Sequence, residues 1–525
     1  MHMIHRRSVL ISALSWMPAA RMAQAAAAPL VAETAYGKVR GAGVNGVYIF
    51  RGIPYGGPTE GAGRFMPPSK PEKWAGVRDA TLNGPQCVQQ GGNVFTSPQL
   101  GEYFGGGRPD RQELAKEPMS ENCLVLNVLT QGLKGKRPVM VYMHGGGFGS
   151  QSALLTLFSD QHVREQDVVL VGINHRLNVF GYTYLGGLSD RFAVGNVGQL
   201  DLIAALEWVR ENIASFGGDP RNVTVFGESG GGAKISTLMG MPAAKGLFHK
   251  MIVQSGSLLR VGDPEAATKA AKALMDKLGV LKPEDLQKIP AADLFKAGSG
   301  GGGGLGGSPV IDGHSILKQP WDPIAPAESA GLPLLVGNCK DESTLFGGSQ
   351  FQNLDEAGLK AALVKNGMPA EKVDPLLALY HRDHPKESPS DLYFRISTDR
   401  GARRNAARQA ELKLADGKTK VFVYYFQWNT PVGDGRLRAF HTADLPLEMR
   451  LTRYPESGQL SKQLSGAWAA FARTGNPSQK GLPWPAYTLE KRETMMFDVP
   501  KSEIVNDPDK EERLMLRGLP SGGLL

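Results

Sequence analysis

The sequence predicts an α/β fold in which helices cover a mostly parallel central sheet. Short apolar runs typical of buried strands recur from residue 138 onward: Pro138–Met143, Val168–Ile173, Asn222–Phe226, Met251–Gln254, Leu332–Val336 and Val421–Phe426. Between the second and third runs, Gln199–Phe216 has one apolar helical face, made of Leu202, Leu206, Val209 and Ile213. Strands that alternate with helices in this way are typical of a parallel sheet with helical layers.

The composition supports a large folded domain and excludes several other classes of protein. Of 525 residues, 41% are hydrophobic and 21% charged, which excludes a disordered or fibrous chain. The formal net charge is +8, but the basic residues are scattered, so we expect no nucleic-acid partner. No apolar run approaches the ~18 residues of a membrane-spanning helix. No repeat or shift in composition marks a boundary, so we expect residues 26–525 to form a single domain; the oligomeric state is not indicated.

The first 25 residues have the features of a cleaved export signal. Arg6 and Arg7 precede a short apolar core, Val9–Ala20, and Ala23-Gln24-Ala25 fits a small-x-small cleavage site. The arginine pair also resembles a twin-arginine signal, which exports folded proteins. We therefore predict a periplasmic or secreted protein of bacterial type. The alternative is an N-terminal segment that is merely helical or disordered.

Two glycine-rich segments resemble nucleotide-binding motifs, but neither lies between a predicted strand and a predicted helix as such motifs require. Gly41-x-Gly43-x-x-Gly46 has the spacing of a dinucleotide fingerprint, yet its Asn45-Gly46 pair is typical of a hairpin turn before a strand. Ser299–Ser308 lacks the Lys-Ser/Thr of a phosphate loop and indicates a flexible connection. We therefore expect no cofactor, and we expect no metal.

The most specific motif follows the run at Asn222–Phe226. Gly227–Gly231 reads GESGG, a G-x-S-x-G sequence, and the helix-compatible segment Ala233–Met239 comes shortly after it. In this strand–turn–helix context the turn strains the backbone of the serine and exposes its hydroxyl. The motif predicts that Ser229 is a nucleophile. The alternative is an ordinary glycine turn.

A second glycine run follows the strand predicted at Pro138–Met143. His144–Phe148 reads HGGGF, and consecutive glycines let backbone N–H groups converge on one point. Such donors stabilise the negative oxygen that develops during acyl transfer, by about 3–4 kcal/mol for one donor. Beside a G-x-S-x-G motif, this run predicts an oxyanion hole.

A serine nucleophile needs a base and an orienting acid, which follow the serine in the order acid, histidine. His381 and His384 lie in a charged stretch that we expect to be a solvated loop. His441 follows the strand predicted at Val421–Phe426 and is the best candidate for the base.

The acid should follow the strand predicted at Leu332–Val336. Asp341 and Glu342 are adjacent there, and their chemistry alone does not distinguish them. Asp312 is a third, weaker candidate.

With these motifs, the sequence resembles the type-B carboxylesterases, the cholinesterase-like branch of the α/β-hydrolases. Phe216–Ser229 matches the family's nucleophile signature throughout, and Phe50–Tyr55 and Trp468–Pro477 match further family motifs. The resemblance extends from about Val39 to about Asp498. It implies an α/β-hydrolase fold with large loop and helical insertions that form a substrate gorge. It also implies hydrolysis of small-molecule carboxylic esters.

The resemblance further implies roles for individual residues. It assigns the acid to Glu342, so the implied triad is Ser229, Glu342 and His441. The implied oxyanion donors are the backbone N–H groups of Gly146, Gly147 and Gly230. The implied supporting residues are Glu228 and Ser255.

One disulfide is expected in an exported protein with three cysteines. Cys87 and Cys123 fall where the family places its first disulfide. That bond would close a loop of ~36 residues, worth roughly 4 kcal/mol in loop-closure entropy. It would leave Cys339 unpaired; the alternative is three buried free thiols.

Five positions depart from the usual family pattern. Gly230 replaces alanine, Ser343 and Thr442 replace glycine, Asn122 replaces aspartate and Val125 replaces tyrosine. At position 230 the donor is a backbone group, so we expect function to survive with a looser turn. We expect the changes at 343 and 442 to alter the shape of the pocket, and Asn122 to alter a local salt bridge.

The predicted reaction is acyl transfer from an ester to water through an acyl-enzyme on Ser229, with His441 as base and then acid. If the pKa of His441 is little perturbed, activity should fall as the pH drops through roughly 6–7. One alternative is the same chemistry on an amide, lactone or thioester, or transesterification. The other is a catalytically inactive binding module on the same fold.

Overall fold

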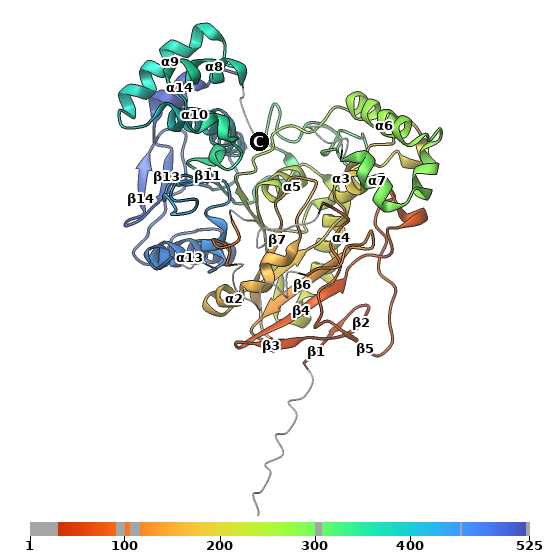
Figure 1. The fold of residues 1–525 in the computed structure, drawn as a ribbon. Helices are drawn as coiled ribbons and strands as arrows, with labels where there is room; N and C mark the ends of the chain where they lie inside the picture. The colour runs from red at the N-terminus through yellow and green to blue at the C-terminus, as the bar shows by residue number, and fades with distance from the viewer. Residues whose placement is uncertain (1–29, 91–99, 106–115, 300–306, 452–453, 521–525) are drawn as a thin grey trace, which may run out of the picture.

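The computed structural model describes residues 30–90, 100–105, 116–299, 307–451 and 454–520, and an 11-stranded sheet runs through them (Figure 1). The strand order is β14-β13-β12-β11-β10-β9-β7-β8-β6-β4-β3. The strands are β3 (Ala42–Val44), β4 (Val47–Pro54), β6 (Val125–Thr130), β7 (Arg137–Met143), β8 (Val169–Ile173), β9 (Gly218–Glu228), β10 (Lys250–Gln254), β11 (Leu334–Cys339), β12 (Val421–Phe426), β13 (Glu493–Phe497) and β14 (Glu503–Asn506). A separate sheet contains β1 (Val31–Thr34), β2 (Gly37–Arg40) and β5 (Val77–Asp79).

The centre of the large sheet is parallel, as predicted. Every pairing from β8 through β7, β9, β10, β11 and β12 to β13 is parallel, and antiparallel pairs occur only towards the two edges of the described sheet. The six predicted strands correspond to β7 through β12. Val44 pairs with Val47 in an antiparallel hairpin, which confirms the turn expected at Asn45-Gly46.

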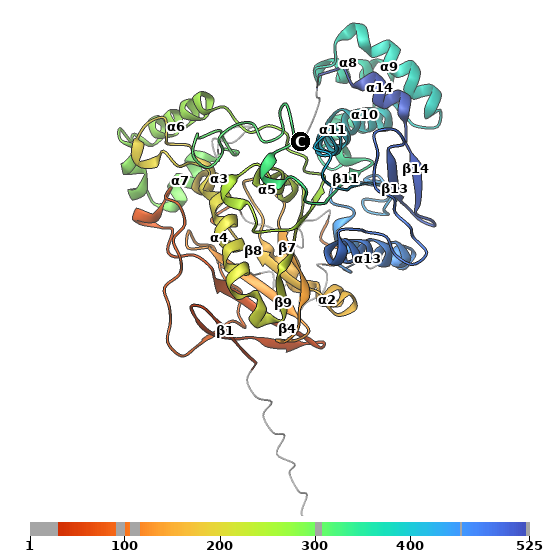
Figure 2. The same ribbon diagram turned by 180° about the vertical axis from the view of Figure 1, so that it is seen from behind.

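Both faces of the sheet are buried, which explains why its strands are apolar throughout. Val139, Val141 and Met143 of β7 belong to one core cluster with the apolar face of α4 (Val197–Asn212). Met140 and Tyr142 of the same strand belong to a second cluster with α13 (Gly458–Thr474). Figure 2 shows α4 lying across β8 and β9. The predicted helix Gln199–Phe216 is thus α4 followed by a short 3-10 turn.

The remaining helices lie mostly around the end of the sheet where the strand-following loops gather. Those close to the sheet are α2 (Asp160–Gln166), α3 (Asn178–Tyr182), α5 (Gly230–Leu238), α11 (Arg404–Leu414) and α12 (Leu445–Glu448). Those in larger insertions are α6 (Pro264–Leu278), α7 (Ala291–Gly298), α8 (Glu356–Lys365), α9 (Ala370–Asp383), α10 (Pro389–Thr398) and α14 (Lys510–Leu516). Helices α8, α9, α10 and α14 share an apolar cluster of their own and form the upper left lobe in Figure 1.

The charged stretch around His381 and His384 is not the solvated loop that we expected. His381 lies within α9, and His384 directly follows that helix. Leu376 and Tyr380 are buried at helical spacing, so the charges of this stretch occupy the outer face of a helix. His384 Nε2 lies 2.5 Å from Glu512 Oε1 in α14.

Two predictions fall outside the described residues: the export signal at residues 1–25 and most of the Ser299–Ser308 connection. Among the helices that are described, none has the length and apolar character needed to cross a membrane.

Candidate active site

Ser229 lies in a tight turn between β9 and α5. Its backbone dihedrals are φ 56° and ψ −124°, a region that residues other than glycine rarely adopt. The Ser229 N–H donates to Gln254 O at 2.8 Å, and the Ala233 N–H donates to Ser229 O at 3.0 Å. A Cβ atom on Gly231 would lie 2.0 Å from Met143 O, so the helix approaches the strand this closely only with glycine there. The turn has the strained geometry that the G-x-S-x-G motif predicts.

The glycine loop after β7 packs directly against this turn. Gly146 and Gly147 have φ angles of 74° and 58°, which favour glycine. The N–H groups of Gly146, Gly147 and Gly230 donate no hydrogen bond within the described part of the chain. A Cβ atom on Gly230 would lie 2.2 Å from Gly147 O. The looser turn expected at Gly230 is therefore wrong: the missing methyl group allows closer contact with the loop.

Lys234 is a residue of the site that the sequence analysis missed. It is completely buried in α5, and its Nζ donates to His144 O at 2.8 Å and to Gly145 O at 3.4 Å. It also lies 5.8 Å from the centre of the Phe148 ring. Burial lowers the pKa of Lys234 to about 7. The one available signal was a single lysine among the small and apolar residues after the nucleophile motif.

Lys234 constrains the direction of one peptide unit in the glycine loop. The C=O and N–H groups of a trans peptide point in opposite directions. Because the Lys234 ammonium binds the Gly145 carbonyl oxygen, the N–H of Gly146 in the same peptide unit points away from the ammonium. Gly146 lines the cavity described below, so the lysine positions a backbone donor that it does not itself contact.

Glu342, rather than Asp341, contacts His441. The Nδ1 atom of His441 contacts Glu342 Oε2, and both side chains are buried. The other carboxylate oxygen, Oε1, accepts hydrogen bonds from Ser255 Oγ at 2.6 Å and from Cys339 N–H at 2.7 Å. Three groups therefore fix the orientation of the Glu342 carboxylate.

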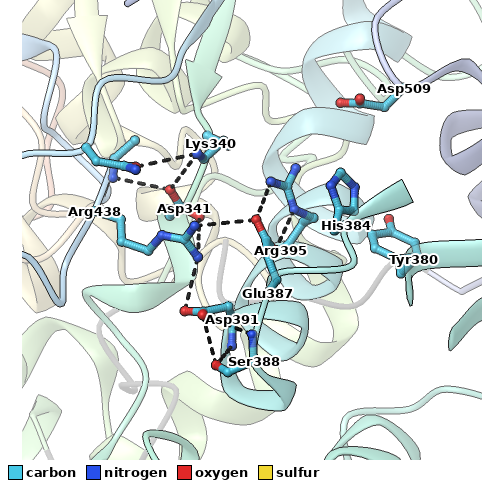
Figure 3. A network of polar contacts seen from close by, with 12 residues as sticks. Lys340, Asp341, Tyr380, His384, Glu387, Ser388, Asp391, Arg395, Arg438 and Asp509 are labelled. Carbon is cyan, nitrogen blue, oxygen red and sulfur yellow. Dashed lines mark hydrogen bonds and ion pairs between the residues drawn. The ribbon is translucent and has the colours of Figure 1, made fainter. Parts of the chain in front are cut away.

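Asp341 instead forms hydrogen bonds with the backbone of the loop that carries His441 (Figure 3). Its N–H donates to Ala439 O at 2.9 Å, and its Oδ2 accepts from the Ala439 N–H at 3.2 Å. Arg438 lies 3.9 Å from Asp341 Oδ1, 3.0 Å from Asp391 Oδ1 and 3.4 Å from Glu387 Oε1. Glu387 in turn pairs with Arg395 of α10 at 2.7 Å. These ion pairs join the loop that carries His441 to α10.

Asp312 has a structural role in a different part of the chain. It accepts backbone hydrogen bonds from Gly195 at 2.9 Å and from Ser315 at 2.7 Å. It therefore holds a turn and is not the partner of His441.

The second ring nitrogen of His441 faces another carboxyl group. Nε2 lies 3.3 Å from Glu228 Oε1, and no hydrogen bond joins it to the Ser229 hydroxyl in the described structure. Burial alone would lower the pKa of His441, but the nearby Glu228 and Glu342 carboxylates raise it to about 9. Burial raises the pKa of Glu228 to about 8, against the opposing effect of His441. The condition for the expected value of 6–7, a little-perturbed imidazole, is therefore not met at this site.

These groups meet at one cavity of about 1100 Å³, a size that accommodates an organic ligand. The predicted site residues that line it are Gly146, Gly147, Glu228, Ser229, Gly230, Ser255 and His441. Glu342 lies behind His441, and apolar side chains such as Leu155, Phe346 and Leu445 complete this part of the wall. Within the described ranges, no group of three or more His, Cys, Asp or Glu side chains could hold a metal ion. The arrangement suits nucleophilic attack on a polarised carbonyl.

The sequence of nearly the whole chain matches a known family. Residues 28–515 match the family model described as the carboxylesterase family. The chain belongs to the carboxylesterase family. The para-nitrobenzyl esterase of Bacillus subtilis (strain 168) is 37% identical to this carboxylesterase over 519 residues, which cover 94% of this chain and 99% of the relative. Liver carboxylesterase 1 of Oryctolagus cuniculus is 31% identical over 521 residues, which cover 88% and 89%.

Solved esterase structures are similar to this carboxylesterase along most of its length. A Geobacillus stearothermophilus carboxylesterase matches with a TM-score of 0.79 at 34% identity, covering 93% of this chain and all of that one. A structure titled PNB esterase matches with a TM-score of 0.77 at 35% identity, covering 93% and 99%. The carboxylesterase therefore has the α/β-hydrolase fold and is a carboxylic ester hydrolase that acts on small-molecule esters.

The cysteines of the carboxylesterase are free thiols in the structure. Cys87, Cys123 and Cys339 are all buried, and the disulfide expected between the first two is not formed. A hydrogen bond with Cys87, together with burial, raises the pKa of the Cys123 thiol well above its usual value. The two thiols are therefore neighbours, as the family resemblance implies.

Two of the departures from the family pattern have clear local effects. Thr442 has φ 78°, a conformation that favours the glycine usual in the family, and its buried hydroxyl has no hydrogen-bond partner among the described residues. Asn122 leaves the neighbouring salt bridge intact, because Glu121 pairs with Arg64 at 2.5 Å. Asn122 Oδ1 instead accepts from the Thr59 N–H at 2.8 Å.

Proposed function

We propose that this carboxylesterase hydrolyses esters through a Ser229–Glu342–His441 triad and a covalent acyl-enzyme. The observation that supports it most directly is the shared cavity: Ser229, unbonded backbone donors and His441 all line it. Behind them, Glu342 contacts His441 and is itself fixed by two further hydrogen bonds. A serine nucleophile, a base, an orienting acid and an oxyanion site are the parts that acyl transfer requires.

In the first half of the reaction, Ser229 Oγ attacks the ester carbonyl carbon while neutral His441 Nε2 takes the hydroxyl proton. The N–H groups of Gly146, Gly147 and Gly230 stabilise the negative oxygen that forms. His441 then donates its proton to the leaving alkoxy oxygen as the C–O bond breaks. This step releases the alcohol and leaves an acyl group on Ser229.

In the second half, water attacks the acyl carbonyl and His441 takes a proton from it. Collapse of the tetrahedral intermediate returns that proton to Ser229 Oγ and releases the carboxylic acid. In the resting structure Nε2 faces Glu228, so the ring or the serine side chain must move slightly when substrate binds. Such tightening on substrate binding is common in hydrolases.

Glu228 acts electrostatically in this mechanism. Its carboxyl group lies 3.3 Å from His441 Nε2, so in its ionised form it stabilises the imidazolium that forms during each proton transfer. The same interaction raises the pKa of His441 and reduces the fraction of neutral base at pH 7. Glu228 therefore stabilises the charged intermediate at the expense of the resting base.

The test is release of p-nitrophenol from p-nitrophenyl butyrate by the wild type and by Ser229→Ala. We expect the wild type to show a burst that matches the enzyme concentration, and Ser229→Ala to lose at least about 10³-fold in kcat. Ser257→Ala is a matched control, because Ser257 lines the same cavity and its buried hydroxyl has no hydrogen-bond partner in the part of the chain that the structure describes. A fluorophosphonate should label Ser229, as peptide mass spectrometry would show. Full activity in Ser229→Ala would refute the mechanism. Because the B. subtilis relative is named a para-nitrobenzyl esterase, a para-nitrobenzyl ester is a suitable second substrate.

We also propose that residues 1–25 direct export and that Cys87 and Cys123 form a disulfide in an oxidising compartment. The contact between the two thiols supports this, since a disulfide needs neighbouring cysteines. Protein isolated from the periplasm or medium should begin near residue 26 and yield a Cys87–Cys123 cross-linked peptide without reduction. Recovery of the protein from the cytoplasm alone, with residues 1–25 retained, would refute export, and free thiols on exported protein would refute the disulfide.

A further inference from the structure

The cavity of Ser229 has a second side that ester cleavage does not use. This side is formed by the π-helical turn η10 (Asp399–Arg403), by α11 and by α14 with the residue that follows it. It carries five arginines: Arg403, Arg404, Arg408, Arg513 and Arg517. Below, this set is called the arginine wall.

The acidic side chains along the arginine wall already have partners. Asp399 pairs with Arg403 at 3.2 Å and accepts from the Tyr380 hydroxyl at 2.9 Å. Glu512 contacts His384 at 2.5 Å. Glu411 lies 2.8 Å from Arg492, outside the wall, and only 3.7 Å from Arg408. The carboxylates of the wall therefore leave part of its positive charge uncompensated.

Carboxylates from outside the wall neutralise two of its arginines. Arg403 pairs with Asp509 at 2.8 Å, and Arg513 pairs with Asp507 at 2.7 Å. A sixth arginine of the cavity, Arg260, lies on the loop after β10 and pairs with Asp322. The guanidinium groups of these three arginines are therefore already engaged in ion pairs within the protein.

Arg404 and Arg517 remain without a carboxylate partner among the residues that the structure describes. Arg404 is half-buried and donates to the backbone carbonyl of Leu519. Arg517 is exposed at the end of α14. A guanidinium has five N–H donors in a planar fork, so both residues have donors to spare for a ligand.

The cavity is therefore polarised between its two sides. Leu155, Phe346 and Leu445 make the side near His441 apolar, whereas the arginine wall is cationic. We propose that the arginine wall is a subsite for an anionic group, so that the enzyme favours esters that carry a carboxylate remote from the scissile bond. This inference rests on the proposed function, because it assumes that Ser229 attacks an ester held in the same cavity. The guanidinium fork matches a carboxylate in a bidentate geometry.

The test compares pairs of esters in which one member carries a terminal carboxylate and the other does not. On the acyl side, mono-p-nitrophenyl glutarate and suberate are compared with p-nitrophenyl pentanoate and octanoate. On the alcohol side, 4-acetoxybenzoate is compared with phenyl acetate. The readout is the ratio of kcat/KM for the anionic ester to that for its neutral counterpart, at 20 mM and 500 mM NaCl.

We expect the wild type to favour the anionic member of at least one series at low salt. Arg404→Gln and Arg517→Gln should each lower that ratio about 3- to 10-fold, and salt should lower it in the wild type, because a partly exposed ion pair is screened. Arg221→Gln removes the same charge at an exposed position that does not line the cavity, and should leave the ratio unchanged.

Equal ratios in the wild type and both cavity variants would overturn the subsite. So would an equal fall in Arg221→Gln, since this would point to net charge alone. Failure of the subsite is distinguishable from failure of the serine mechanism. In the first case Ser229→Ala still abolishes turnover of the neutral esters, and in the second it does not.

Discussion

The ammonium nitrogen of Lys234 lies 2.8 Å from the carbonyl oxygen of His144, directly beneath the glycine loop that faces Ser229. A buried cation is costly unless polar groups surround it, and here two backbone carbonyls and one aromatic face do so. The loop and the helix that follows the nucleophile are thus joined by a side chain that is not among the residues lining the cavity. Lys234 is a positioning residue.

Replacing Lys234 with methionine should lower kcat about 10- to 100-fold with little change in KM. The reason is that one misplaced oxyanion donor costs about 10²–10³ in kcat, and here the loop is only loosened. Lys234→Gln, which keeps a donor, should recover part of the loss. Steady-state kinetics and the affinity for a trifluoromethyl ketone, which mimics the tetrahedral state, would measure it. An unchanged affinity for that inhibitor in Lys234→Met would contradict a role in positioning the loop.

Glu228→Gln should move the pH profile towards acid. His441 accepts a proton only when neutral. The kcat/KM of the wild type, which reports on the free enzyme, should therefore rise with pH through the pKa of His441, about 9. Removing the Glu228 charge lowers that pKa, so the same rise should occur at a lower pH. The measurement is kcat/KM from pH 5 to 10, with Glu371→Gln on the exposed surface of α9 as control. Identical profiles for Glu228→Gln and the wild type would mean that Glu228 does not set the basicity of His441.

Gly230→Ala should slow the reaction although alanine is usual in relatives. The added methyl carbon would meet Gly147 O at 2.2 Å, so the oxyanion loop must move, and we expect kcat to fall about 10-fold or more. Gly43→Ala is the control, because a Cβ at that position meets no atom within 4 Å. Equal kcat values for Gly230→Ala and the wild type would contradict this prediction, because they would mean that the loop can shift without loss of activity.

Thr442→Gly should stabilise the protein by about 1 kcal/mol in the free energy of unfolding. The left-handed backbone costs a residue other than glycine about 1–2 kcal/mol, of which the greater chain entropy of glycine offsets about 0.5–1 kcal/mol. The substitution also removes a buried hydroxyl that has no hydrogen-bond partner within the described ranges. Urea unfolding would measure the change. Thr268→Gly, within α6, should instead lose stability, by about 0.3 kcal/mol or more, because glycine is the poorer helix former. A similar loss at both positions would show that Thr442 is not strained.

The strands and the nucleophile turn could be predicted because their signals are periodic or motif-like. Strands β7 to β12 are apolar along their length since both faces of the sheet are covered. By contrast, Asp341 and Glu342 are chemically similar neighbours, and only the direction of the backbone decides which carboxylate meets His441. Family resemblance, not residue chemistry, pointed to Glu342.

Other features of the site have no pattern in one sequence. Lys234 is a single charge in a short helix, and its role depends on carbonyl groups about 90 residues earlier in the chain. The raised pKa of His441 depends on two carboxylates that approach its ring from opposite sides. His384 looked solvated because the charges around it form the outer face of α9.

The ion pairs of Figure 3 connect the loop of His441 to α10, which belongs to the helical lobe and not to the sheet. Ser229, in contrast, is held by β9, β10 and α5. Mild denaturant or heat that detaches the lobe would therefore remove these ion pairs and loosen the loop of His441, which would keep its contacts with Asp341 and Glu342, while the nucleophile turn stayed folded. The enzyme would lose activity before its central sheet unfolded, and would regain activity once the lobe docked again.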